Sequence, residues 1–201
     1  FSAMATNNGG GDGGLKIVEL LKVADSLKHL KRTGWVRCNV PEPETVASHM
    51  YRMALLAWSL RGHPACAAVD MDKCLRMSLV HDIGEALIGD ITPFCGVSDQ
   101  SKYEQEKRAV ETISSLVPSV TGDEWLALWR EYETAETQEA GVVKQLDKFD
   151  MIAQAADYEQ KYGLDLSDFF TSTVNSFTTE PFVSWNRELR ERREAARKEK
   201  Q

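Results

Sequence analysis

His81 and Asp82 stand side by side at the end of an apolar run, and Glu85 follows one helical turn later. Polar side chains in such a run are costly to bury unless they have partners. An imidazole and a carboxylate together form a mixed nitrogen and oxygen half-site, which suits a divalent cation such as Mn, Fe, Co or Zn. On a helix all three side chains can face one neighbourhood. We therefore predict that the pair grips a metal ion, with a further carboxyl group beside it.

His49 is the best candidate for a third ligand, since two ligands alone do not hold a metal. It shares one side of a predicted helix with Met53, Leu56 and Leu60. A lone histidine in this setting is more often a hydrogen-bonded core residue than a ligand. Combined with the His-Asp pair further along the chain, the pattern favours the ligand interpretation.

A carboxylate from a distant helix should complete the site, and Asp147 and Asp150 are both candidates. The apolar arc of this helix places Asp150 just inside its margin and Asp147 just outside it, which slightly favours Asp150. Either carboxylate could instead be exposed and paired with Lys144 or Lys148, an arrangement that is common and contributes little stability. Periodicity alone leaves the choice open.

The elements that must position these residues are predicted to be helices. From residue 15 onward the apolar residues recur with a helical period, and no segment shows the sustained alternation of a half-buried strand. Thr45 is a suitable cap for the helix that carries His49. The expected helices cover residues 15–30, 45–60, 70–87, 102–116, 122–133, 138–162, 167–173 and 184–201.

The chain of 201 residues is expected to form one all-α domain, a helical bundle over residues 15–180. Residues 1–14 combine a sequence like an expression scar with an Asn- and Gly-rich run, and we expect them to be disordered. Residues 181–201 are helix-prone and charged but lack a broad apolar face, so we expect a solvated terminal helix.

The composition limits the class of partner. A formal net charge of −7 argues against binding of a nucleic-acid polymer, although a local cation could still attract a small anion. No apolar stretch approaches the roughly 20 residues needed to span a bilayer, and the four cysteines have no paired spacing. We expect a cytoplasmic protein with free thiols and no membrane association.

The order His49, His81-Asp82, Asp147 resembles the signature of the HD-domain phosphohydrolases, an all-helical family. The resemblance favours Asp147 over its neighbour as the final ligand. Three longer segments, residues 32–35, 44–54 and 81–91, look like the 5'-deoxynucleotidase branch of that family.

The resemblance implies hydrolysis of deoxyribonucleoside 5'-monophosphates with one divalent cation, Mn, Co, Fe, Mg or Zn, in a protein that forms a homodimer. It implies that Glu85 transfers protons and that Asp90 accepts a hydrogen bond from deoxyribose. Trp35 could stack on a base, and Arg32 or Arg37 could bind the phosphate. Some members place an arginine immediately before this tryptophan, where the present chain has glycine, so the choice of arginine stays open.

Two alternatives remain. Another HD-type hydrolase with one metal could act on a nucleoside triphosphate or an alarmone, and a non-catalytic helical adaptor could retain the metal as a structural staple. Glu85 and Asp90 argue against the adaptor, because a staple needs no proton shuttle.

Overall fold

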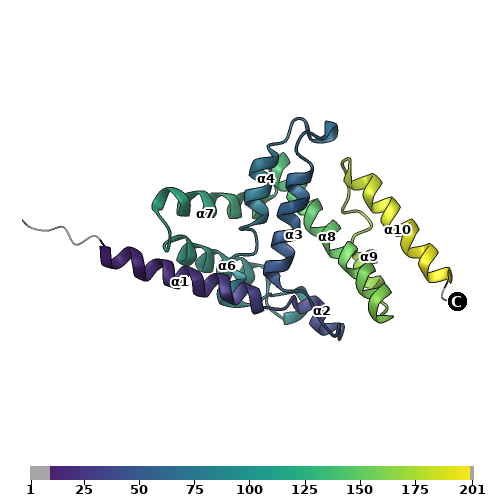
Figure 1. Cartoon of the computed structure of the whole chain (residues 1–201), viewed down its shortest axis with the longest axis horizontal. Coiled ribbons are helices and arrows are strands. Elements are labelled where there is room, and N and C mark those ends of the chain that lie inside the picture. Colours follow the sequence, from purple (N-terminus) through teal and green to yellow (C-terminus); the bar gives the residue numbers. More distant parts are fainter. Residues whose placement is uncertain (1–9, 200–201) are drawn as a thin grey trace, which may run out of the picture.

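The computed structural model describes residues 10–199, which are mostly helical (Figure 1). Within that range there is no β-strand, only an isolated bridge between Lys31 and Thr45, and the all-α prediction is confirmed. The helices are α1 (Gly10–His29), α2 (Thr33–Arg37), α3 (Val46–Ser59), α4 (Met71–Ser78), α5 (Glu85–Ile88), α6 (Asp99–Ser114), α7 (Ser119–Thr134), α8 (Gln138–Tyr162), α9 (Ser167–Ser172) and α10 (Phe182–Glu199), with short 3-10 turns at Pro64–Cys66 and Pro93–Cys95.

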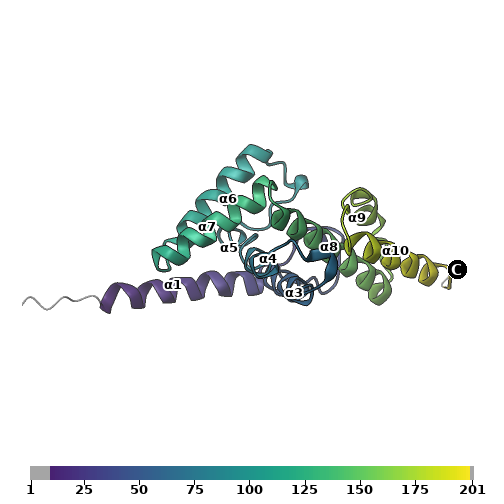
Figure 2. The same cartoon turned by 90° about the horizontal axis from the view of Figure 1, so that it is seen from above.

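Helices α3, α4 and α8 form the centre of the molecule, with α6 and α7 on one side and α10 on the other (Figures 1 and 2). Their facing side chains Met53, Met77 and Leu146 are fully buried in the main hydrophobic core. Helix α1 packs on this centre through Val23 and Leu27, and its N-terminal part extends beyond the bundle in both views. The centre therefore holds both His49 and the two candidate aspartates of α8.

Side-chain caps fix the start of the two helices that carry these residues. Thr45 accepts a hydrogen bond from the Ser48 amide at 3.1 Å, as expected from the sequence, and Thr137 does the same for the Ala140 amide at 3.2 Å. Such caps satisfy amides that have no partner within the helix. They set the registers that bring the ligand candidates together.

The prediction of one helix over residues 70–87 is wrong, because the helix ends at Ser78 and a run of turns separates α4 from α5. His81 and Asp82 lie in this irregular segment. Gly84 explains why the chain passes so close to α6: a Cβ atom there would lie 3.3 Å from the Glu106 carbonyl oxygen. The period of the apolar residues within one segment could not reveal this close approach to another helix.

Helix α2 was also not predicted, since it lies between the expected helices 15–30 and 45–60. The Thr33 amide donates to the Asp90 carboxylate at 2.7 Å, and the Thr33 hydroxyl donates to the Asp90 carbonyl at 2.7 Å. Gly89, with a φ of 80°, turns the chain after α5 toward this contact. Thr33 and Asp90 are 57 residues apart in the sequence, so no local pattern could predict the contact that stabilises α2.

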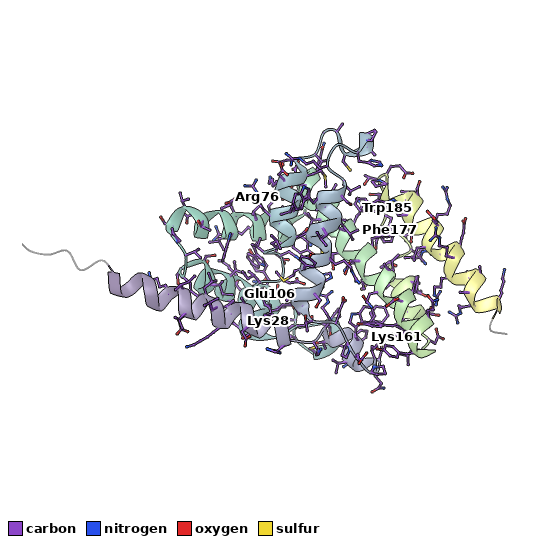
Figure 3. The ribbon with its side chains drawn as sticks, in the orientation of Figure 1. Lys28, Arg76, Glu106, Lys161, Phe177 and Trp185 are labelled. Atoms are coloured by element: carbon purple, nitrogen blue, oxygen red, sulfur yellow. The ribbon has the colours of Figure 1, made fainter. Side chains whose placement is uncertain are left out.

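Helix α10 is not the solvated helix expected from its composition. Phe182 is fully buried, and Trp185 packs on Phe149 of α8 at 5.3 Å between ring centroids. Phe177 reaches the same ring, and Figure 3 shows Phe177 and Trp185 in the space between α8 and α10. A few large apolar residues thus attach a mostly charged helix.

An ion pair secures the other end of α10. The Arg193 guanidinium donates two hydrogen bonds to Glu159, at 2.6 and 2.8 Å, and lies 3.9 Å from the centre of the Phe170 ring. Replacing Arg193 with alanine leaves the Glu159 carboxylate with the Leu166 amide at 2.8 Å and Arg197 at 4.0 Å, so we expect a loss of about 1.5–3 kcal/mol in the free energy of unfolding, the usual contribution of hydrogen bonds to a charged group, measured by denaturant titration.

The neighbouring Arg192→Ala is the matched control for this prediction. Arg192 is 77% exposed and pairs with Glu188 one turn away, so its replacement should cost about 1 kcal/mol or less. Equal losses for the two variants would contradict the structural role of Arg193.

Helix α1 begins at Gly10, five residues before the predicted start, and residues 1–9 of the expected disordered tail lie outside the described residues. All four cysteines are free, as predicted. None of the helices between residues 10 and 199 combines the length and the apolar character needed to cross a bilayer.

Candidate metal centre

Two buried imidazoles face each other at the centre of the bundle. His49 is completely buried on α3, His81 is 3% exposed, and their ring centroids are 5.4 Å apart. The Nδ1 atom of His81 lies 3.0 Å from the carbonyl oxygen of Ser78, which can only accept, so Nδ1 donates this hydrogen bond and Nε2 is the ring nitrogen that faces the cluster. The Nε2 atoms of both histidines are buried without a hydrogen-bond partner. Nitrogens in that state are suited to a cation.

Two carboxylates complete the cluster. The Asp147 Oδ1 atom lies 3.4 Å from Nε2 of His49, and His49, His81 and Asp147 offer ligand atoms within 4.8 Å of one another. The Asp82 Oδ2 atom lies 3.2 Å from Nε2 of His81 and 3.8 Å from Nε2 of His49. The structure thus brings together all four predicted ligands, and a set of two imidazoles and two carboxylates fits a divalent transition metal.

Arg32 lies against the same carboxylates. Its guanidinium donates to Asp82 at 2.9 Å and approaches Asp147 at 3.8 Å. Burial by itself would raise the pKa of Asp82, but His81, Arg32 and His49 outweigh it and hold that pKa well below its usual range. The Asp82 carboxylate is therefore ionised in the metal-free protein, as a carboxylate that binds a metal must be.

The pKa of His49 in the metal-free protein reflects opposing effects. Burial and the nearby Arg32 lower it, and the carboxylates of Asp147 and Asp150 raise it more, to about 9. For Asp147, Lys148, His49 and Arg32 overcome the effect of burial and keep the pKa well below its usual range. The carboxylates thus concentrate negative charge where a cation would bind.

Glu85 lies beside the cluster as the first residue of α5. It is 5% exposed, and its Oε2 atom has no hydrogen-bond partner. Burial, together with the charges of Asp82 and Asp90, raises its pKa well above the usual range of a glutamate. A carboxyl group whose pKa is raised holds its proton more firmly than an ordinary glutamate, which suits a group that takes part in general acid-base chemistry.

Two of the expected substrate contacts have other partners in the structure. Trp35 is only 2% exposed, donates its indole N–H to Glu44 at 3.0 Å and packs on Tyr158 and Phe169, so its ring is a core element and offers no face to a base. Arg37 lies over the exposed Phe94 ring at 4.9 Å and makes no contact with the cluster. Arg32 is the predicted arginine that reaches the site.

Two residues around the cluster, Tyr132 and Arg52, were missed by the sequence reasoning. Tyr132 on α7 donates to Asp147 at 3.4 Å and packs its ring against His81. Lys148 pairs with Asp147 at 3.2 Å, as the sequence allowed, although Asp147 is buried and not exposed. Arg52 contacts Asp150 behind His49. Of the missed residues, only Arg52 could have been expected from its distance along the sequence, since it follows His49 by one turn of α3. Nothing local pointed to Tyr132.

Two imidazoles and two carboxylates converge in the core of this helical domain. These features are typical of helical proteins that hold a divalent cation between their helices. The chain belongs to the HD domain family, whose model matches residues 24–184.

Named relatives agree with this assignment. The chain is 39% identical over 196 residues to the 5'-deoxynucleotidase HDDC2 of Mus musculus, covering 96% of this chain and 95% of the relative. It is 42% identical over 169 residues to the 5'-deoxynucleotidase HDDC2 of Dictyostelium discoideum, covering 80% and 89%. A conserved hypothetical protein from Pyrococcus furiosus has a similar structure, with a TM-score of 0.70, 32% identity and coverage of 89% and 99%.

Proposed function

We propose that this chain is a metal-dependent 5'-deoxynucleotidase, which hydrolyses deoxyribonucleoside 5'-monophosphates to the deoxynucleoside and phosphate. The observation that carries the proposal is the pair of unpartnered Nε2 atoms on His49 and His81, beside an unpartnered carboxyl oxygen of Glu85. The names of the relatives supply the substrate class.

His49, His81, Asp82 and Asp147 are the proposed ligands of one divalent cation, which is Mn, Co, Fe, Mg or Zn. When bound, such a cation polarises the phosphoryl group and lowers the pKa of a water molecule. Four protein ligands would leave a six-coordinate cation further positions for substrate and water.

The remaining residues bind the substrate and move protons. Glu85 accepts a proton from the attacking water and returns one to the leaving 5'-oxygen of the sugar. Arg32 is proposed to offer its forked donors to the phosphate, and its contact with Asp82 at 2.9 Å supports a position beside the metal. No role in substrate binding is proposed for Trp35 or Arg37.

Asp90 is proposed to select deoxyribose. Its Oδ2 atom is occupied by the Thr33 amide, which fixes the carboxylate and leaves Oδ1 to accept a hydrogen bond from a sugar hydroxyl. A rigid acceptor at this position discriminates against a sugar whose additional hydroxyl does not fit.

Phosphate release from a panel of nucleotides tests the proposal. With Mn²⁺ or Co²⁺ added, we expect release from deoxyadenosine monophosphate at a kcat/KM at least about 10-fold above that for adenosine monophosphate, as one mismatched hydroxyl can discriminate. The panel includes nucleoside triphosphates, an alarmone and cyclic dinucleotides. A preference for a triphosphate or an alarmone would replace the proposed substrate, and no turnover of any compound would favour the metal-stapled adaptor.

The proposal also covers the cellular location, the oligomeric state and the bounds of the catalytic domain. We propose a cytoplasmic homodimer that acts on free mononucleotides and does not bind membranes. The net charge of −7 supports the further proposal that it does not bind nucleic-acid polymers. The catalytic domain is proposed to span residues 15–180, with residues 181–201 as an extension that contacts it through α10.

A further inference from the structure

His49 presents its two ring nitrogens to different carboxylates. The Nε2 atom faces the metal cluster, with Asp147 at 3.4 Å, whereas Nδ1 lies 2.7 Å from the Oδ2 atom of Asp150. Both His49 and Asp150 are 0% exposed. The imidazole therefore lies between a proposed ligand and a second carboxylate on the far edge of the ring.

Asp150 is itself held from behind by Arg52. The Nε atom of Arg52 donates to Oδ1 of Asp150, and Nη2 donates to Oδ2 at 2.9 Å and to the Asp150 carbonyl at 3.3 Å. The guanidinium also donates to Gln154, one turn further along α8. This forked contact fixes both oxygens of the carboxylate, which is the geometry in which Arg and Asp pair most strongly.

The helix registers place these contacts in two layers. Arg52 follows His49 by three residues on α3, and Asp150 follows Asp147 by three residues on α8. Residues three apart lie on the same side of a helix. The first layer thus contains the proposed ligands, and the second layer, one turn away, contains a carboxylate and its arginine.

The second layer continues into the core. Nη2 of Arg52 approaches the Glu44 carboxylate at 3.4 Å, and the other oxygen of Glu44 accepts the Trp35 indole N–H at 3.0 Å. The Glu44 amide donates to the Tyr158 hydroxyl oxygen at 2.8 Å. These contacts restrict the position of the arginine, and they connect the buried Trp35 to the network through Glu44.

A different interpretation would make Glu44, His49 and Asp150 a second cation site, because their ligand atoms lie within 4.8 Å of one another. Arg52 already supplies a positive charge to both carboxylates, however, at 3.4 Å from Glu44 and 2.9 Å from Asp150. A metal ion there would have to displace the guanidinium, and it would have no free oxygen of Asp150 to bind.

We propose that Asp150, clamped by Arg52, is a positioning residue that holds the His49 ring with Nδ1 protonated and Nε2 directed at the metal. A carboxylate that accepts the second N–H of a histidine ligand fixes its tautomer and orientation and makes it a stronger ligand. The inference rests on the proposed metal site and adds to it the residue that prepares one ligand.

The test is the affinity of the full chain for Mn²⁺, measured by calorimetry without any nucleotide. Asp150→Asn keeps the shape of the side chain but removes its charge, and we expect Mn²⁺ to bind about 10- to 100-fold more weakly. In the assay of phosphate release, the Mn²⁺ concentration for half-maximal rate should rise by a similar factor, with a smaller change in kcat at saturating Mn²⁺. Asp123→Asn, an exposed aspartate on α7, is the matched control and should bind as the unmodified chain does.

Arg52→Lys is the second variant, because Asp150 is buried and its replacement could prevent folding. Arg52 is 38% exposed, and lysine keeps the charge but loses the fork, so a smaller weakening of Mn²⁺ binding is expected in a folded protein. Circular dichroism checks the folding of each variant. Unchanged Mn²⁺ affinity in folded Asp150→Asn, or in Arg52→Lys if the first does not fold, overturns the inference. Failure of the unmodified chain to bind Mn²⁺ would instead contradict the proposed metal site.

Discussion

Exchange of Glu85 for glutamine is expected to reduce kcat for deoxyadenosine monophosphate by about 100- to 10,000-fold, the usual contribution of a positioned proton-transfer group. The amide retains the size of the side chain but cannot accept or donate the proton. Glu85 is outside the set His49, His81 and Asp147, whose ligand atoms converge. The affinity for Mn²⁺ should therefore change little. Phosphate release at saturating metal and calorimetry with Mn²⁺ separate the two effects.

Glu106→Gln is the control for this exchange. Glu106 is a second buried glutamate near the centre, labelled in Figure 3, and it is 8% exposed and paired with Lys102 at 3.3 Å. Burial raises its pKa too, but its carboxylate already has a cationic partner. We expect the kcat of the Glu106→Gln variant to stay within about 10-fold of the kcat of the unmodified chain. Loss of a proton-transfer group would reduce kcat by more than this. A large loss for Glu106→Gln and none for Glu85→Gln would move the proton shuttle to α6.

The second large effect is expected at the metal itself. Treatment with a chelator should abolish phosphate release, and addition of Mn²⁺ should restore it in the unmodified chain. In Asp147→Asn the restoring concentration of Mn²⁺ should increase by more than about 100-fold, above the range observed when only a supporting residue of a metal ligand is lost. The physical reason is that an amide oxygen replaces an ionised carboxylate directed at Nε2 of His49.

Comparison with Asp150→Asn makes this prediction specific, because both aspartates are buried on α8 and both lie near His49. The two carboxylates lie on opposite edges of the imidazole, and so we expect the larger loss of Mn²⁺ affinity for Asp147→Asn. The reverse order would identify Asp150 as the ligand.

Helical periodicity identified the elements where local signals dominate. Helix α8 has the predicted bounds, 138–162, because a threonine cap starts it and Gly163, in the left-handed conformation, ends it. The burial of His49 followed in the same way from its apolar neighbours on α3. Both results depend on residues within one or two turns of each other.

Elements that depend on distant partners were not predictable in this way. The turns between α4 and α5 end where Gly84 packs closely on α6, and α2 starts where Thr33 meets Asp90. The clamp of Arg52 on Asp150 joins residues 98 positions apart. A single sequence contains the residues of such contacts but not the geometry that joins them.

The proposed ligands are spread along the chain, on α3, in the turns after α4 and on α8, and this has a consequence for folding. In the unfolded chain these side chains are dispersed, so a cation that needs all of them binds only the native state. At a free concentration of 100 times its dissociation constant, an ion of this kind would favour the native state by about 2.7 kcal/mol. It would act as a reversible cross-link between segments far apart in sequence. The supply of metal ions in the cell would then govern the abundance of the protein as well as its activity.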